Sequence, residues 1–148
     1  MKFQFLMTNL MSCFNSEFEF QSALIRRLKA MGMYCRNIPD IGNTKKPFDL
    51  SVNYKGRGWA LELKIIKTQK EPTPENVYKK LYPHQIANLL EFQSWKSQWV
   101  SRVIAYHGWT NSVWIYTIRK DWEQVRLKES CHYDRFDTNL EEHFDLIF

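Results

Sequence analysis

Residues 47–66 constrain the fold more than any other stretch of this 148-residue chain. Polar and apolar side chains alternate along most of the stretch, which is typical of half-buried strands. Lys55 and Gly56 lie at its midpoint, where a glycine favours a tight turn. A two- or four-residue loop centred there pairs residues whose numbers sum to 111. A three-residue loop would shift the register by one residue and undo that pairing.

In this register Asp49 lies directly opposite Glu62, and both share a face of the sheet with Lys64. Directly opposed residues have Cβ atoms about 4.5–5.5 Å apart, so two carboxylates placed there repel each other. A shared proton or a divalent cation with oxygen ligands would relieve that repulsion. The ammonium of Lys64 balances only part of the charge. The alternative is a solvated polar face with one salt bridge.

The composition favours one folded domain over residues 1–148. Hydrophobic residues make up 44% of the chain and aromatic residues 16%, which argues against disorder, and the length is sufficient for a hydrophobic core. No apolar run approaches the ~18 residues of a membrane helix, and no signal peptide is recognisable, so we expect a cytoplasmic protein without a membrane partner. Cys13, Cys35 and Cys131 lack zinc-binding spacing and are interpreted as buried or incidental thiols.

Charge is unevenly distributed along the chain. The net charge is +5, but residues 130–148 contain five acids and one arginine, a net of −4, which leaves +9 on residues 1–129. A basic body with an acidic C-terminal segment favours a polyanionic partner, and nucleic acid is the first hypothesis.

The remaining segments alternate between helical and strand patterns, which indicates an α/β fold. Ser16 is a suitable N-cap for a helix that ends near Met31, ahead of Gly32. Residues 1–15 are interpreted as a strand, an arm or a dimerisation segment. The other expected elements are strands at 33–38, 100–106 and 112–118, helices from Pro74 and from Tyr82 to about Trp95, and a closing helix formed by Trp122 and the acidic tail.

Two acids stand at the start of the first helix. Glu17 lies on the apolar stripe one turn before Phe20, so it is expected to point inward beside the sheet, whereas Glu19 lies off that stripe. Either acid also suits the positive end of the helix dipole, so position alone assigns no function to it.

This arrangement resembles the PD-(D/E)XK nuclease superfamily and, within it, the Holliday-junction resolvases of the RecU-like group. The superfamily motif is an aspartate on one strand and Glu-x-Lys on the next, matched here by Asp49 and by Glu62, Leu63 and Lys64. A Tyr-Lys-Gly-Arg turn at 54–57 and a His-Gln pair at 84–85 strengthen the likeness. The resemblance implies a restriction-endonuclease-like α/β core with a mixed central sheet flanked by helices.

Some positions depart from the family pattern. The first-helix acid of the superfamily falls on Gln21, and Glu17 is our substitute for it, with Glu19 and Gln21 left as alternatives. Pro47 replaces a RecU-like threonine, and the chain has little room for the stalk insertion of RecU-like proteins.

The resemblance implies Mg²⁺-dependent hydrolysis of DNA phosphodiesters at four-way junctions, with Mn²⁺ as an alternative ion. Asp49 and Glu62 would hold the ion, and the Leu63 carbonyl and the Gln85 side chain would complete its oxygen shell. Lys64 would orient the attacking water or stabilise the developing charge. Glu17 would bind the metal, or a water on it, from the helix.

Four basic residues are expected to contact DNA phosphates: Lys45, Lys46, Lys55 and Arg57. A four-way junction has near-twofold symmetry, so a C2 homodimer is expected, with residues 3–7 either at the interface or in the protein's own core. Two other functions compete with the resolvase: a nuclease of the same fold that acts on other DNA, of repair or restriction type, and a catalytically silent nucleic-acid-binding module.

Overall fold

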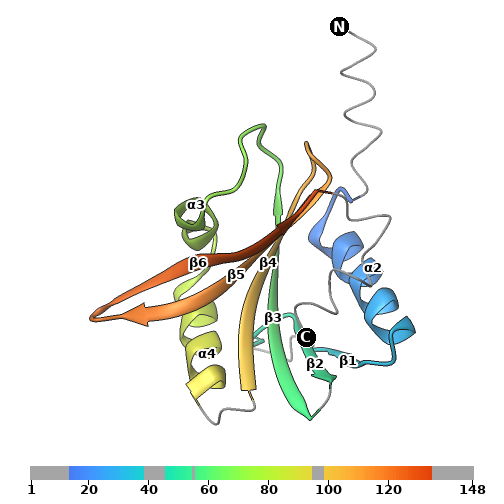
Figure 1. Cartoon of the computed structure of the whole chain (residues 1–148), viewed down its shortest axis with the longest axis horizontal. Coiled ribbons are helices and arrows are strands. Elements are labelled where there is room, and N and C mark those ends of the chain that lie inside the picture. The colour runs from blue at the N-terminus through green and yellow to red at the C-terminus, as the bar shows by residue number, and fades with distance from the viewer. Residues whose placement is uncertain (1–13, 39–45, 55, 95–98, 135–148) are drawn as a thin grey trace, which may run out of the picture.

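The computed structural model describes residues 14–38, 46–54, 56–94 and 99–134 (Figure 1). Its elements are α2 (Glu17–Ala30), β1 (Tyr34–Asn37), β2 (Leu50–Tyr54), β3 (Arg57–Ile66), α3 (Pro74–Lys79), α4 (Pro83–Ser94), β4 (Trp99–His107), β5 (Ser112–Asp121) and β6 (Gln124–Tyr133). The six strands form one sheet in chain order. All neighbours pair antiparallel except β3 and β4, which are parallel. This confirms a mixed α/β sheet flanked by helices.

The central hairpin has the expected register. Leu50 pairs with Leu61 and Tyr54 pairs with Arg57, so the numbers of paired residues sum to 111. Gly56 has a φ of 76°, a left-handed conformation that a two-residue hairpin loop requires and that glycine adopts at little cost. The loop therefore fixes which face of the sheet each hairpin side chain occupies.

Helix α2 is defined by its caps and by one apolar stripe. The Ser16 hydroxyl accepts a 3.2 Å hydrogen bond from the Glu19 main-chain N–H, as an N-cap does. Gly32, just past the helix end, has a φ of 84° and allows the chain to turn back. The stripe buries Phe20, Ala23, Leu24 and Leu28 against β1 and β3.

Because side chains alternate across the sheet, each face has its own hydrophobic core. The core under α2 includes Leu24, Leu28, Leu61, Leu63 and Ile104. The core under α3 and α4 includes Ala60, Val77, Leu89, Val103 and Tyr116. The crossover from β3 to the parallel strand β4 runs through α3 and α4, as parallel neighbours require. Figure 1 shows α2 and the α3–α4 pair separated by the sheet.

The expected closing helix is wrong in the part of the chain that the structure describes. Residues 124–133 form strand β6, which pairs with β5 through the two-residue turn Trp122-Glu123. Val125 and Leu127 alternate with exposed residues and pack toward α3 and α4, which stabilises a strand over a helix. None of the described helices is long and apolar enough to span a bilayer.

Several predictions concern residues outside the described ranges. They are the arm or dimerisation segment at 1–13, the phosphate contacts Lys45 and Lys55, the helix end near Trp95 and the acidic tail at 135–148.

Candidate active site

Three ionisable side chains converge on the face of the sheet that α4 covers. Asp49 precedes β2, whereas Glu62 and Lys64 are two residues apart on β3. Their exposed fractions are only 6%, 2% and 7%. The predicted shared face is confirmed, but the face is buried and is not a solvated polar surface.

Main-chain and side-chain contacts fix the position of Asp49. Its N–H donates to the Leu61 carbonyl at 3.1 Å, and its own carbonyl accepts from Ile38 N–H at 3.1 Å. Its Oδ2 accepts from the Leu63 N–H at 2.8 Å, while Oδ1 lies 2.9 Å from the Lys46 ammonium. The carboxylate is therefore held in one orientation at the start of β2.

Only one of the two carboxylate oxygens of Glu62 accepts a hydrogen bond from a described residue. Its Oε1 accepts a 2.7 Å hydrogen bond from Gln85 Nε2 and lies 3.8 Å from the Lys64 ammonium. Its Oε2 is buried and has no hydrogen-bond partner among the described residues. Such an atom is rare because burying an unpaired polar group costs free energy. A cation or a proton at this oxygen would remove that cost.

Burial raises the pKa of Glu62 to about 8 from an ordinary value of 4.5. The negative charge of Asp49 acts in the same direction, as does the hydrogen bond that a protonated Glu62 carboxyl can donate to Asp49, and the cations of Lys64 and Lys46 oppose them. Without a metal ion, Glu62 therefore holds a proton near neutral pH. The predicted repulsion between the opposed carboxylates is relieved here by protonation.

The Lys64 ammonium lies inside this cluster. It is 3.5 Å from Gln85 Oε1 and 5.8 Å from the centre of the Tyr82 ring. Gln85 Oε1 also accepts the Tyr82 N–H at 2.9 Å, which ties the start of α4 to the site. Tyr82 itself is 63% exposed, so its ring lies at the protein surface next to the buried Lys64 ammonium. Spacing alone gave no signal that Tyr82 would contact Lys64.

The available ligand atoms fit a hard divalent cation. Leu63 directs its N–H toward Asp49, and the carbonyl of a strand residue points to the same side as its N–H. The β2–β3 ladder ends at the pair Leu50–Leu61, so that carbonyl lies beyond the paired region. Two carboxylates and neutral oxygens suit Mg²⁺ or Mn²⁺. Within the described ranges, no three or more His, Cys, Asp or Glu side chains are grouped so that they could hold a metal ion by themselves.

The predicted metal role of Gln85 needs one qualification. In this structure its Nε2 faces Glu62, while its Oε1 is engaged by Tyr82 and Lys64. The amide acts here as a hydrogen-bond donor to the carboxylate. It would have to rotate to present its oxygen to an ion at Glu62.

The expected inward orientation of Glu17 is wrong. Glu17 is exposed on α2, which packs on the face opposite to Asp49 and Glu62. Phe14, ahead of the helix, packs against the core on that face, with its ring 5.6 Å from that of Phe20 and 5.0 Å from that of Tyr106. Glu19 and Gln21, the alternatives for the first-helix acid, make contacts away from the two carboxylates.

Glu19 accepts the Asn15 N–H at 2.9 Å and so caps the helix. Gln21 donates to the Asn37 side chain. The contacts of the described residues connect neither side chain to the two carboxylates.

The other candidate residues are placed as follows. Lys46 pairs with Asp49, an interaction that the sequence did not suggest, and Arg57 is exposed beside the β2–β3 turn. Cys35 and Cys131 are free thiols. Burial raises the pKa of Cys35 to about 11, so it is not a reactive nucleophile.

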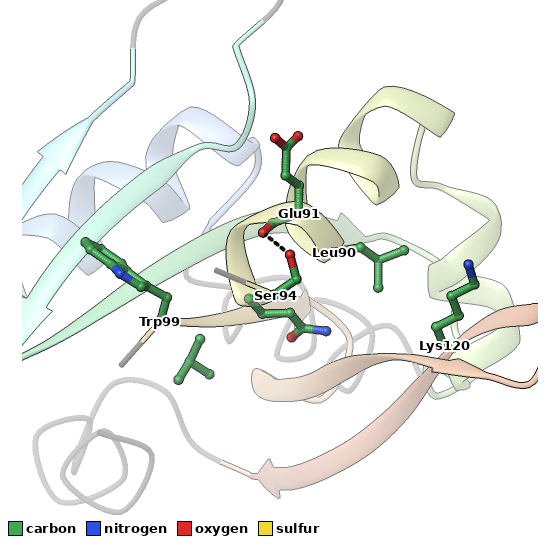
Figure 2. Close-up of a pocket in the computed structure, with 7 residues that line it drawn as sticks. Leu90, Glu91, Ser94, Trp99 and Lys120 are labelled. Carbon is green, nitrogen blue, oxygen red and sulfur yellow. Dashed lines mark hydrogen bonds between the residues drawn. The ribbon is translucent and has the colours of Figure 1, made fainter. Parts of the chain in front are cut away.

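A separate groove of about 610 Å³ lies between the end of α4 and strands β4 and β5 (Figure 2). Leu90, Trp99 and Lys120 are among its lining residues, and Ser94 donates to the Glu91 carbonyl at 2.8 Å. Neither Asp49 nor Glu62 lines this groove. It is therefore distinct from the cluster described above.

Comparison with known proteins supports the fold. No protein-family model matches the chain, and no curated protein matches it by sequence. Among solved structures, it is similar to Hjc from Archaeoglobus fulgidus, a Holliday junction resolvase from an archaeal hyperthermophile. The likeness has a TM-score of 0.53 at 14% identity and covers 76% of this chain and 88% of Hjc. The chain thus has a mixed α/β nuclease fold like that of Hjc.

Proposed function

We propose that this protein is a Mg²⁺-dependent endonuclease of the PD-(D/E)XK type that resolves four-way DNA junctions. One observation supports this most strongly: Asp49 and the incompletely satisfied Glu62 converge beside the buried ammonium of Lys64. Structural salt bridges leave few buried oxygens unpaired, whereas metal-dependent hydrolytic sites need such oxygens. The fold likeness to a junction resolvase supports the choice of DNA as substrate.

In the proposed mechanism, Asp49, Glu62 and the Leu63 carbonyl would hold the ion. A bound Mg²⁺ lowers the pKa of a coordinated water and neutralises charge on the phosphate oxygens. Asp49 is fixed for this role by the Leu63 N–H and by Lys46. Glu62 must release its proton before it binds the ion.

Lys64 supplies a fixed positive charge next to the reacting phosphate. Its ammonium is confined by Gln85, Glu62 and the Tyr82 ring, so little reorganisation is needed during the reaction. Gln85 positions Glu62 through its hydrogen bond to Oε1, and its side-chain oxygen would help to hold the ion in the opposite amide orientation. Glu17 has no part in this arrangement, because α2 covers the other face of the sheet.

DNA phosphates are proposed to contact Arg57 and Lys46, together with Lys45 and Lys55. These side chains provide affinity without reading the sequence. Two opposed cuts in one junction require two active sites, so we also propose a C2 homodimer.

The test compares an end-labelled four-way junction with a linear duplex of the same sequences. Each is incubated with Mg²⁺, Mn²⁺ or EDTA and with the variants Asp49→Asn and Glu62→Gln. Glu91→Gln, a carboxylate on α4 away from the site, is the matched control. Paired symmetric nicks in the junction, lost in EDTA and in both site variants, support the proposal.

Two results would replace the resolvase function with another. Equal cutting of the linear duplex would retain the metal site and indicate a nuclease that acts on other DNA. Tight DNA binding without cleavage under either metal would indicate a binding module.

A further inference from the structure

The β5–β6 hairpin ends in a bulky residue at a position that favours glycine. Trp122 is the first of two loop residues between the paired Asp121 and Gln124, and its φ is 54°. A left-handed conformation is strained for a large side chain, and two-residue hairpin loops prefer Gly, Asn or Asp there. The turn therefore gains no local stability from the tryptophan.

Trp122 also contributes no burial to the fold. It is 95% exposed, more than the other exposed large hydrophobic side chains of the described residues. A strained and fully exposed indole offers a flat surface on which a partner can stack. Nucleic acid bases are such partners, and stacking on an aromatic side chain tolerates any base.

One face of the same hairpin is basic. Ile118 and Leu127 are buried toward α3 and α4, so the residues next to them in sequence point to the opposite face. On that face Arg119 lies directly across from Arg126, and Lys128 lies one pair further along. Directly opposed like charges destabilise a ladder.

Asp121 bridges both arginines, with distances of 3.7 Å to Arg119 and 3.0 Å to Arg126. The single negative charge of Asp121 compensates only one of the three positive charges that Arg119, Arg126 and Lys128 place on this face. The arginine side chains remain 51% and 60% exposed. We define Arg119, Arg126 and Lys128 as the hairpin strip.

The hairpin strip and the candidate active site lie on opposite faces of the sheet. Glu62 pairs with Val103, and Val103 pairs with Tyr116, six residues before Trp122. At about 3.3 Å per residue, the hairpin tip is about 20 Å along the strand direction from Glu62. A straight duplex cannot lie on both faces of one sheet at once. A branched DNA can place one arm on each.

We propose that the β5–β6 hairpin binds a second arm of branched DNA, with phosphates on the hairpin strip and Trp122 stacked on a base at the branch, where the continuous stacking of the duplex is interrupted. This inference rests on the proposed function and specifies how the protein selects a branched substrate. Charge complementarity to phosphate and the exposed indole both favour DNA as the occupant.

The test measures binding of the full-length protein in EDTA, so that cleavage plays no part. The labelled DNAs are a four-way junction and a linear duplex of the same sequences. One variant is Trp122→Gly, which suits the positive φ of the turn and is expected to fold as the wild type does, checked by circular dichroism. The other is Arg126→Gln with Lys128→Gln. The matched controls are Phe18→Ala, an exposed aromatic on α2, and Arg26→Gln with Lys29→Gln.

Trp122→Gly is expected to weaken junction binding about tenfold and duplex binding less than about twofold. A 2-aminopurine at the branch should change fluorescence with the wild type but not with this variant. The strip variant should lower the salt-dependence slope of junction binding by about 2, because it removes two phosphate contacts. The control variants should bind as the wild type does.

Other outcomes overturn the inference. If the hairpin variants weaken junction binding and duplex binding equally, the hairpin makes no arm-specific contact. The same conclusion follows if Arg126→Gln with Lys128→Gln has the same effect as Arg26→Gln with Lys29→Gln. Unchanged binding of both hairpin variants would show that it contacts no DNA, while junction cleavage by the wild type would leave the proposed function intact. Selective binding of RNA would assign the hairpin to another partner. A wild type that neither binds nor cuts a junction would instead refute the proposed function.

Discussion

Gln85 on α4 donates a 2.7 Å hydrogen bond to Oε1 of Glu62 on β3. The same amide accepts the Tyr82 N–H through its oxygen, so one side chain links the helix start to the sheet. Glu62 is thereby held with its Oε2 buried beside Asp49, where no described residue donates a hydrogen bond to it. The helix determines which oxygen of the carboxylate remains for a cation.

Gln85 can be tested by two replacements. Gln85→Leu removes the bond to Glu62 and leaves buried polar groups unpaired, so we expect a loss of about 1–3 kcal/mol in the free energy of unfolding. Gln85→Glu places a third carboxyl group at the site. It should destabilise the metal-free protein and increase the stabilisation that Mg²⁺ provides. Urea unfolding with and without MgCl₂ measures both effects.

The matched control for this pair is Gln93→Leu. Gln93 also lies on α4 and donates to a strand carbonyl, that of Ile118, at 2.9 Å. Its loss should lower stability without changing the effect of Mg²⁺. An equal response of the Gln93 and Gln85 variants to Mg²⁺ would contradict the metal site.

The pKa of Glu62 predicts how stability depends on pH. It is raised from 4.5 to about 8, so between these values the folded protein holds a proton that the unfolded chain has released. The free energy of unfolding of the metal-free protein should therefore fall as pH rises from about 4.5 to about 8, and then level off. Urea unfolding in EDTA across this range measures the slope.

Glu62→Gln should remove most of that slope, because glutamine does not titrate. Mg²⁺ competes with the proton for the same oxygens, so its stabilising effect should grow with pH up to about 8. A wild-type slope that persists unchanged in Glu62→Gln would assign the titration to another group.

Much of the candidate site could be predicted from the sequence because the hairpin register depends on local chemistry. Gly56 specifies the loop, and the period-2 alternation then places Asp49, Glu62 and Lys64 on one face. The contact between Gln85 and Glu62 joins residues 23 positions apart. The family resemblance assigned Gln85 to the metal site but did not specify this contact, since periodicity carries no information on how a helix docks.

The two wrong predictions, the inward orientation of Glu17 and the closing helix, also have physical causes. Glu17 is one turn before Phe20 in the sequence but is exposed, and α2 packs on the face opposite the carboxylates, which the apolar stripe of a helix does not specify. Strand β6 was missed because Trp122-Glu123 carries no glycine signal for its turn. The alternation of Val125 and Leu127 was the available clue to that strand.

Gly58 should be essential for packing at the start of β3. It pairs with Trp99, and a Cβ at Gly58 would collide with the Trp99 ring. Gly58→Ala should therefore cost about 1–3 kcal/mol of stability and shift the tryptophan emission spectrum. Gly56→Ala is the control: space is open there, so only the strain of its φ of 76° remains and the emission should not change. Wild-type emission from Gly58→Ala would contradict this packing.

Lys64 and Lys46 should differ in what their loss affects. Lys64 is buried among Glu62, Gln85 and Tyr82, where its charge can act on the reacting phosphate but contributes little to holding the rest of the DNA. Lys64→Ala should thus lower cleavage about 10²–10³-fold and change DNA binding less than about twofold. Lys64→Met, which keeps the volume of the side chain, separates the loss of charge from the cavity. The Lys46 side chain is 31% exposed and also holds Asp49, so Lys46→Met should weaken DNA binding as well as cleavage. Single-turnover cleavage at saturating protein and anisotropy in EDTA measure the two effects. Equal losses of binding and cleavage in both Lys64 variants would show that Lys64 holds DNA and has no role in the chemical step.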